Sequence, residues 1–186
     1  MRSILLLFFT LFPITALADF KITTLYGQEK IRVDNGKDFT VNLYGIAAHK
    51  ILDKGYMIGG SILNGYPDNA VADESRYELH FGKGFRLTTF HPYIMTGLGK
   101  RDYKSSRETS DYYFITIGTK IPLYDKLALD INYRFRDSDD IEWQTNTYRM
   151  GLDYNIDEKV SAGFFVGTVN GDYESTILGV KTGIRF

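Results

Sequence analysis

Few residues of this chain could act as general bases, and their neighbours limit the chemistry open to them. Its three histidines are His49, His80 and His91, and it has no cysteine, which excludes thiolate catalysis and thiolate metal sites. The segment from Glu78 to His80 places a carboxylate and an imidazole two residues apart, on one face of a strand. Such a pair could serve as an oriented base, but a structural hydrogen bond between the two side chains is the favoured interpretation.

The patterns of activated nucleophiles are missing around these histidines. A serine two residues after a histidine would let the imidazole deprotonate the hydroxyl, but Ile51, Gly82 and Tyr93 occupy those positions. The acids between Asp137 and Asp140 have no histidine beside them, as a hydrolase built on paired acids would require. We therefore expect no enzymatic activity, no cofactor and no metal site.

Charged side chains instead recur with the period of a β-strand. From Leu127 to Arg136, five apolar or aromatic residues alternate with Ala, Asp, Asn, Arg and Arg, so one face of this strand is apolar and the other is charged. In a membrane barrel the apolar face meets lipid and the charged face lines the lumen. We favour this over a soluble, lipocalin-like barrel, whose interior would be apolar.

The last strand supports a membrane location. Leu178, Val180, Thr182, Ile184 and Phe186 share one face, and the chain ends on that phenylalanine. The final segment, with Val180, Thr182, Ile184 and Phe186, resembles the C-terminal signature of bacterial outer-membrane β-barrels. That resemblance implies recognition by the barrel-assembly machinery.

The beginning of the chain predicts export. Arg2 precedes an apolar run, and Ala16 and Ala18 form a small-x-small cleavage pattern before Asp19. The apolar run is too short to span a bilayer and contains Pro13. We therefore predict a cleaved signal peptide over residues 1–18 and one barrel domain over residues 19–186.

Alternating segments separated by turn signals predict an all-β fold, a transmembrane antiparallel up-and-down barrel of ten strands, with eight as the alternative. The tight turns include 34–36 and 53–55. In the second strand we expect Phe39, Val41 and Leu43 to face outward. The predicted strands are 20–30, 39–48, 56–66, 76–85, 91–103, 111–121, 127–136, 142–154, 160–170 and 176–186.

Three consecutive segments carry a resemblance to a known family. The segment Pro92–Gly99 resembles the proline-tyrosine-x-x-x-glycine-x-glycine strand of small opacity-type, outer-membrane-protein-A-like barrels, and Ile117–Ile121 and Leu127–Phe135 resemble the two strands that follow it. The resemblance covers about a quarter of the chain. It implies an outer-membrane barrel, usually of eight strands, and members act as adhesins, structural barrels or narrow pores.

The inward-facing charges predict a lumen closed by ion pairs in two tiers. Near the chain termini, Asp130 and Asp153 would meet lysines, and toward the other end Glu29 and Glu78 would meet arginines. The interior of a small barrel is just wide enough for such side chains to fill. The predicted lumen network comprises Lys21, Glu29, Arg76, Glu78, His80, Lys120, Asp130, Arg134, Arg136, Arg149, Asp153, Lys181 and Arg185.

The expected extracellular loops carry many acids, and one loop is basic. Carboxylates could bind divalent cations at a lipopolysaccharide surface, and cationic side chains could pair with lipid phosphates, with solvated loops as the alternative. A formal net charge of -1 argues against nucleic-acid binding. The loop acids are Asp34, Asp38, Asp68, Asp73, Glu74, Asp137, Asp139, Asp140, Glu142, Asp172 and Glu174, and the loop bases are Arg101, Lys104 and Arg107.

Together these patterns predict a non-enzymatic outer-membrane barrel of a Gram-negative bacterium, with a mostly filled, charged lumen and a structural or surface-interaction role. A narrow, porin-like passive channel is the main alternative, and a barrel enzyme acting on lipid or peptide is the third. The expected partners are outer-membrane lipid, lipopolysaccharide and the barrel-assembly machinery. A surface ligand is not specified by the sequence.

Insertion should depend on Phe186. Phe186→Asp removes both an apolar anchor at the membrane interface and the terminal residue of the assembly signature, so we expect loss of folded, heat-modifiable barrel from membranes. Phe186→Leu keeps an apolar end and serves as the control, with near wild-type levels. Equal amounts of folded protein for Phe186→Asp and wild type, measured by gel shift, would show that the residue is dispensable.

Overall fold

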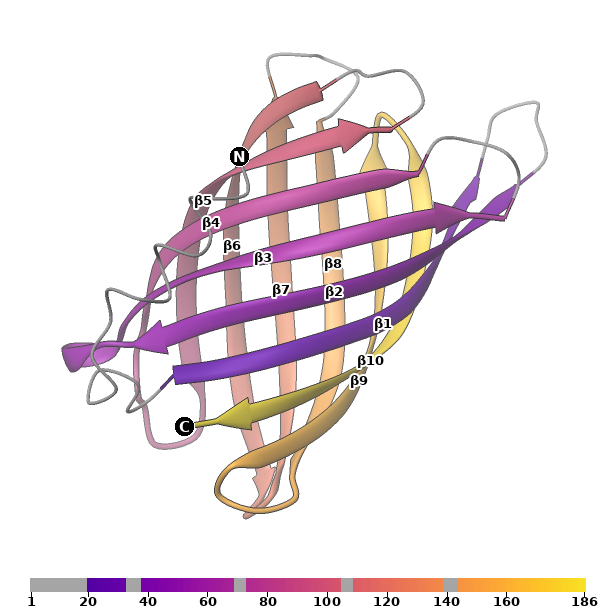
Figure 1. Cartoon of the computed structure of the whole chain (residues 1–186). Helices are drawn as coiled ribbons and strands as arrows, with labels where there is room; N and C mark the ends of the chain where they lie inside the picture. Colours follow the sequence, from indigo (N-terminus) through magenta and orange to yellow (C-terminus); the bar gives the residue numbers. More distant parts are fainter. Residues whose placement is uncertain (1–19, 33–37, 69–72, 105–108, 139–143) are drawn as a thin grey trace.

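The chain forms a closed antiparallel barrel. The computed structural model describes residues 20–32, 38–68, 73–104, 109–138 and 144–186, and within them each strand pairs with its chain neighbours while β1 also pairs with β10 (Figure 1). The strands are β1 (Phe20–Arg32), β2 (Phe39–Ile51), β3 (Tyr56–Pro67), β4 (Glu74–Gly84), β5 (His91–Tyr103), β6 (Thr109–Tyr124), β7 (Leu127–Ser138), β8 (Thr145–Asn155), β9 (Val160–Gly171) and β10 (Glu174–Arg185).

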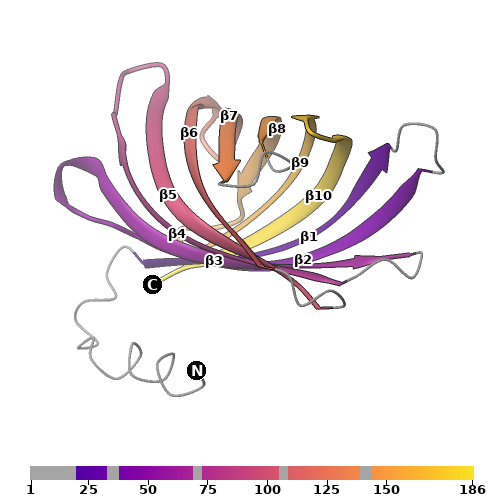
Figure 2. The ribbon, with the colours of Figure 1, turned by 90° about the horizontal axis from the view of Figure 1, so that it is seen from above.

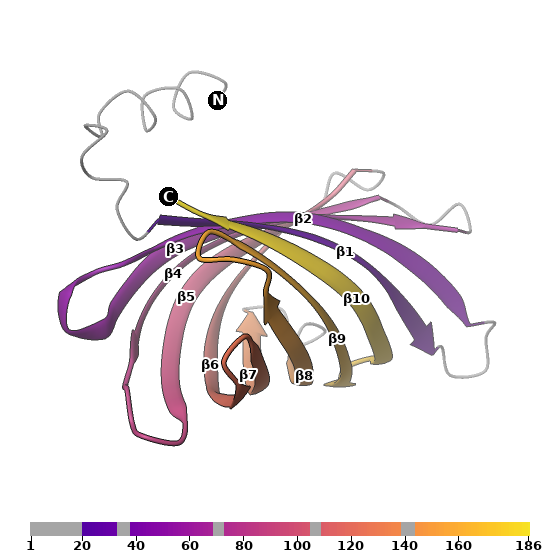
Figure 3. The same cartoon turned by 90° about the horizontal axis from the view of Figure 1, so that it is seen from below.

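The ten-stranded up-and-down topology predicted from the alternation is therefore confirmed, and the eight-stranded alternative is wrong. Figures 2 and 3 show the tilted strands following one another in chain order around the wall. The predicted signal peptide over residues 1–18 and the predicted turn at 34–36 lie outside the described residues.

The two ends of the barrel differ in their connections. At the end where the chain terminates, the Phe186 amide donates a hydrogen bond to the Phe20 carbonyl, 2.9 Å away, and short turns join β2–β3, β4–β5, β6–β7 and β8–β9. In outer-membrane barrels the short turns are periplasmic, so we take this end as periplasmic. In its β8–β9 turn, hydrogen bonds from the Val160 and Lys159 amides lower the pKa of Asp157.

The outer surface is apolar between two aromatic belts. Leu79, Leu98 and Leu178 are 74%, 70% and 60% exposed, which fits a wall that contacts lipid. Tyrosine pairs cross neighbouring strands, Tyr26 with Tyr44 and Tyr133 with Tyr148, and near the periplasmic end Phe20 lies against Phe186 with ring centroids 6.5 Å apart. None of the helices in the described part of the chain is long and apolar enough to cross a membrane.

The C-terminal strand faces outward as its alternation predicts. Val180, Ile184 and Phe186 are about half exposed, at 52%, 51% and 56%. The hydroxyl of Thr182, on the same face, shares a hydrogen bond with that of Thr24 on β1, 2.8 Å away. This strand closes the barrel by pairing with β1 over its whole length.

The orientation predicted for β2 is wrong. Val41 and Leu43 lie inside the barrel, 4% and 3% exposed, whereas Tyr44 and Ile46 face outward, 49% and 48% exposed. Directly paired residues point to the same face of a sheet, and Val41 pairs with the inward-facing Glu29. Both faces of β2 carry apolar residues, so the register with β1 determines which face points to lipid.

An introduced charged side chain should destabilise the barrel more on the outer face than in the lumen. Ile131 is exposed on the lipid face, and Asn132, the next residue, lines the lumen beside Asp130. Ile131→Arg should destabilise the barrel by about 2–4 kcal/mol near the bilayer midplane, and Asn132→Arg by clearly less. Urea titrations of the protein in liposomes measure the free energy of unfolding of both variants. Equal losses would mean that the two faces are assigned wrongly.

Candidate functional site: the charged lumen

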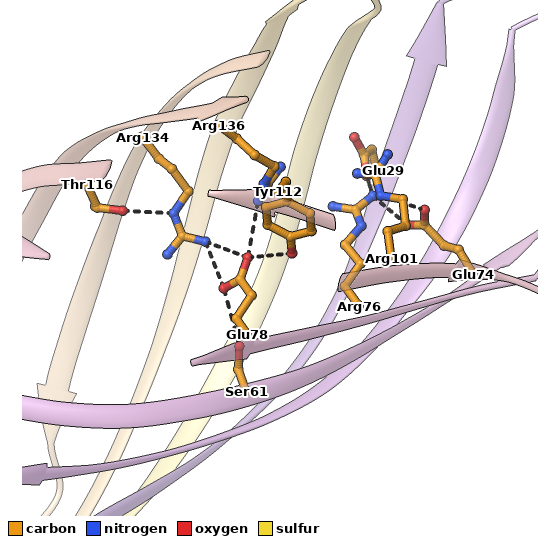
Figure 4. A network of polar contacts seen from close by, with 10 residues as sticks. All are labelled: Glu29, Ser61, Glu74, Arg76, Glu78, Arg101, Tyr112, Thr116, Arg134 and Arg136. Atoms are coloured by element: carbon orange, nitrogen blue, oxygen red, sulfur yellow. Dashed lines mark hydrogen bonds and ion pairs between the residues drawn. The ribbon is translucent and has the colours of Figure 1, made fainter. Parts of the chain in front are cut away.

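Strand alternation places the lumen charges in columns. On β4, residues Glu74, Arg76 and Glu78 follow one another at intervals of two and share the inward face, as do Arg134 and Arg136 on β7. Two strands, β5 and β6, separate Glu78 on β4 from β7, so contact between them requires long side chains and a narrow lumen. Figure 4 shows these side chains meeting in two groups.

The first group is centred on the Glu78 carboxylate. Arg134 Nη1 lies 3.1 Å from one of its oxygens, and Arg136 Nη2 lies 3.5 Å from the other. Tyr112 donates its hydroxyl to the same carboxylate over 3.0 Å, and Ser61 donates over 3.4 Å (Figure 4). This group therefore joins β3, β4, β6 and β7 across the barrel.

The second group lies closer to the extracellular end and contains two carboxylates. Arg76 Nη2 is 3.7 Å from Glu29 and also donates to Glu74, while Arg101 Nε is 3.5 Å from Glu74 (Figure 4). Ser175 of β10 donates its hydroxyl to Glu29 over 2.6 Å. This group joins β1, β4, β5 and β10.

Two members of that group correct the sequence predictions. Glu74 and Arg101 were expected in loops, but both lie on the inward faces of strands and are only 9% and 4% exposed. Both continue period-two columns, Glu74 that of Arg76 and Arg101 that of Gly97 and Gly99. Extending the predicted strand 76–85 by one residue pair would have identified Glu74, and Arg101 already lies within the predicted strand 91–103 although it was counted among the loop bases.

The periplasmic tier joins lysines to two aspartates. Lys120 Nζ lies 3.4 Å from Asp153 and 3.9 Å from Asp130, and Lys181 Nζ lies 2.6 Å from Asp153. The Asp130 carboxylate also accepts a hydrogen bond from the Tyr93 hydroxyl, 2.9 Å away. The structure thus brings together Asp130, Asp153, Lys120 and Lys181.

Among the described residues, four members of the predicted lumen network have no ion pair or hydrogen bond with these groups. Within the described part of the chain, Lys21, Arg149 and Arg185 have no carboxylate within ion-pair distance, and Arg149 lies instead over the Phe165 ring, 5.3 Å from its centroid. His80 shares the inward face with Glu78, but the described hydrogen bonds of Glu78 go to other residues. The hydrogen bond expected between them is not formed.

Aromatic rings fill the remaining space by lying on glycines. Tyr112 covers Gly99 on the paired strand and Phe114 covers Gly97, and a β-carbon at either glycine would come within 2.3 or 2.6 Å of the ring. Only glycine permits this close approach. Phe114 is 0% exposed, so the extracellular half of the lumen is packed like a protein core.

The lysines of the periplasmic tier are more exposed than the arginines of the extracellular groups. Side-chain exposure is 9% for Arg76, 15% for Asp153, 24% for Lys181 and 44% for Lys120. A cavity of about 180 Å³ lies at mid-height, lined by Tyr93, Met95, Thr116, Asp130, Asn132, Arg134, Arg149, Gly151, Phe165 and Lys181. The lumen therefore has a packed extracellular half and a hollow periplasmic half.

The arrangement of these side chains favours structural ion pairs over acid–base catalysis. Each buried carboxylate is bound by cationic side chains, which leaves Glu78 no free edge from which to orient a base. Among the described residues, no group of three or more His, Asp or Glu side chains is placed to hold a metal ion. The loop residues Arg107, Asp139, Asp140 and Glu142 lie outside the described residues.

Removing the Glu78 carboxylate should be costly. Glu78→Gln leaves two buried arginines without a counter-charge, which should reduce the free energy of unfolding by about 3–5 kcal/mol. The control is Glu174→Gln, because the Glu174 pair with Arg32 spans 3.4 Å but both side chains are largely exposed, and its loss should cost about 0–1 kcal/mol. If urea unfolding of folded, reconstituted protein gave similar values for both, the Glu78 group would not stabilise the barrel.

Comparison with known proteins identifies the architecture. No family model matches the chain, and no curated protein sequence matches it. Among solved structures, the KdgM porin in complex with disordered oligogalacturonate matches with a TM-score of 0.53 at 12% identity, over 89% of this chain and 99% of that one. The NanC porin matches with a TM-score of 0.52 at 7% identity, over 90% and 100%. The translocator domain of the autotransporter NalP from Neisseria meningitidis matches with a TM-score of 0.55 at 9% identity, over 90% and 89%.

At such identities these matches establish the fold alone. The fold is that of the outer-membrane β-barrels of Gram-negative bacteria, as the alternation and the terminal strand predict. Membership of the opacity-type family stays a prediction, and the ten strands differ from the eight that this resemblance implies.

Proposed function

We propose that the protein is a non-enzymatic outer-membrane barrel whose lumen is closed at its extracellular half, and that it has a structural or surface-interaction role. The observation that carries the proposal is the burial of the ion pairs there. The side chains of Glu29, Arg76 and Arg136 are 1%, 9% and 9% exposed. A hydrated ion path through this level would leave such charges in contact with water.

The pairing also supports a bracing role. Buried charges are stable only when they are paired and hydrogen-bonded, and here the partners come from strands that are not neighbours in the wall. The same contacts that fill the lumen therefore resist separation of the strands. A barrel braced in this way presents a rigid rim on which the extracellular loops are mounted.

The surface-interaction part of the proposal rests on the extracellular rim. Exposed ion pairs there include Lys30 with Asp38 at 3.1 Å and Lys104 with Asp73 at 3.8 Å. Lysines in such positions can pair with lipid phosphates, and aspartates can share divalent cations with them. We propose lipopolysaccharide as the partner at this rim, and the barrel-assembly machinery as the partner of the C-terminal strand.

A narrow passive channel is the second candidate. It is favoured by the hollow periplasmic half, with its cavity of about 180 Å³, and by the likeness to two structures described as porins, one of them in complex with oligogalacturonate. For conduction, the extracellular half would have to open by movement of Arg76, Arg136 or their partners. The two candidates therefore differ in a measurable property.

Single-channel recording in planar bilayers separates the candidates. We expect no steady conductance from the wild type, and a clear rise for the double variant Arg76→Ala with Arg136→Ala, because both side chains fill the packed level. Arg32→Ala, which changes an exposed outer side chain, is the matched control and should stay silent.

Two results would contradict this proposal in different ways. A steady, sizeable wild-type conductance that is unchanged in the double variant would favour the channel. Turnover of lipid A or of peptide by purified, folded wild-type protein would establish an enzyme instead.

A further inference from the structure

The periplasmic half of the lumen carries an excess of positive charge. In the described part of the chain, five cationic side chains face two carboxylates at this level, in contrast to the extracellular half, where the arginines contact carboxylates directly. The cations are Lys21, Lys120, Arg149, Lys181 and Arg185, and the carboxylates are those of Asp130 and Asp153.

The two carboxylates are already occupied. Asp153 lies between Lys120 at 3.4 Å and Lys181 at 2.6 Å. Asp130 accepts hydrogen bonds from the Tyr93 hydroxyl at 2.9 Å and from the Asn132 amide at 3.4 Å, with Lys120 at 3.9 Å. Neither carboxylate is within ion-pair distance of Arg149.

Arg149 is therefore a partly buried cation without an ion pair among the described residues. Its Nε is buried and has no hydrogen-bond partner there, and its guanidinium carbon lies 5.3 Å from the centroid of the Phe165 ring. An arginine keeps its charge at physiological pH, so it cannot escape the cost of burial by losing a proton. Its planar donors match a carboxylate or a phosphate.

The cavity supplies the space for such a group. The cavity has a volume of about 180 Å³ and is lined by Arg149 and Lys181. Asn132 also lines it, and its amide oxygen Oδ1 is buried without a hydrogen-bond partner among the described residues. The carboxylate of Asp130 is on the same wall but already accepts hydrogen bonds from Tyr93 and Asn132. Pockets that hold drug-sized ligands are larger, at about 300–1,000 Å³, so the occupant must be small. The Lys120 side chain, which lies near the periplasmic end of β6, is 44% exposed, and from this we infer access from the periplasmic mouth.

We propose that this cavity binds a small soluble anion carrying a carboxylate or a phosphate group, which enters from the periplasmic mouth. Arg149 holds the anionic group through its guanidinium, with the Phe165 ring supporting the opposite side of the plane, and Lys181 adds a second positive charge. The site does not depend on whether the extracellular half conducts, because it is reached from the other end.

Calorimetric titration of folded protein in zwitterionic micelles, with inorganic phosphate and with succinate, tests the proposal. We expect saturable binding by the wild type and by Lys126→Gln, a control that removes an exposed lysine in the β6–β7 turn. Arg149→Gln should weaken binding of phosphate and succinate at least tenfold. Glucose, an uncharged control ligand, should bind to none of the three proteins. Absence of wild-type binding, or equal affinity in Arg149→Gln, would overturn the proposal.

Phosphatidylglycerol added to the same micelles distinguishes a soluble anion from a lipid head group. Because the barrel wall separates the cavity from lipid, the affinity for phosphate should not change. Competition by this lipid would place the phosphate site on the outer surface and overturn the proposal.

A second measurement does not require substitution of Arg149. The chain has no cysteine, so Met95→Cys places a single thiol on the cavity wall. A negatively charged methanethiosulfonate should label this thiol at least tenfold faster than a positively charged one, and phosphate should protect it. Equal rates for the two reagents, or no protection, would overturn the proposal even if Arg149→Gln failed to fold.

Discussion

The structure depends on one constraint: a charge inside a narrow barrel surrounded by lipid must find its counter-charge within the lumen. Glu78 meets this constraint with Arg134 and Arg136 at 3.1 and 3.5 Å. Its partners come from β7, which is not a neighbour of β4 in the wall, so pairing the charge also connects strands that share no backbone hydrogen bonds. The charged side chains of the extracellular half are consequently buried and paired, and a change in one member affects contacts to several strands at once.

Glycine makes this packing possible. A ten-stranded wall encloses more space than charged side chains alone fill, and rings such as Tyr112 and Phe114 occupy it by lying on Gly99 and Gly97 of the paired strand. The ring of Phe165 lies on Gly179 in the same way and supports Arg149 from its other side. The glycines of the inward columns thus determine how closely the aromatic rings and the cations approach the wall.

Alternation and turn chemistry are enough to predict the strands, their number and the face of most of them, because each depends on local sequence. The prediction failed at β2, where Val41 and Tyr44 lie on opposite faces and both are apolar, so that only pairing with β1 orients the strand. It failed at Glu74 and Arg101, which were assigned to loops by their polarity although they continue inward columns. The separation of Glu78 from His80 could not be predicted, since it depends on arginines that reach Glu78 from across the barrel.

The two halves of the lumen satisfy the same constraint differently. In the extracellular half, protein carboxylates neutralise the arginines, and the space closes. In the periplasmic half the cations outnumber the carboxylates, and Arg149 borders the cavity without an ion pair among the described residues, although Asp130 lines the same cavity. A counter-ion from solution is the remaining way to neutralise a guanidinium at that position. The two proposals are therefore compatible, because closure depends on the ion pairs of the extracellular half and the proposed anion site on Arg149 in the periplasmic half.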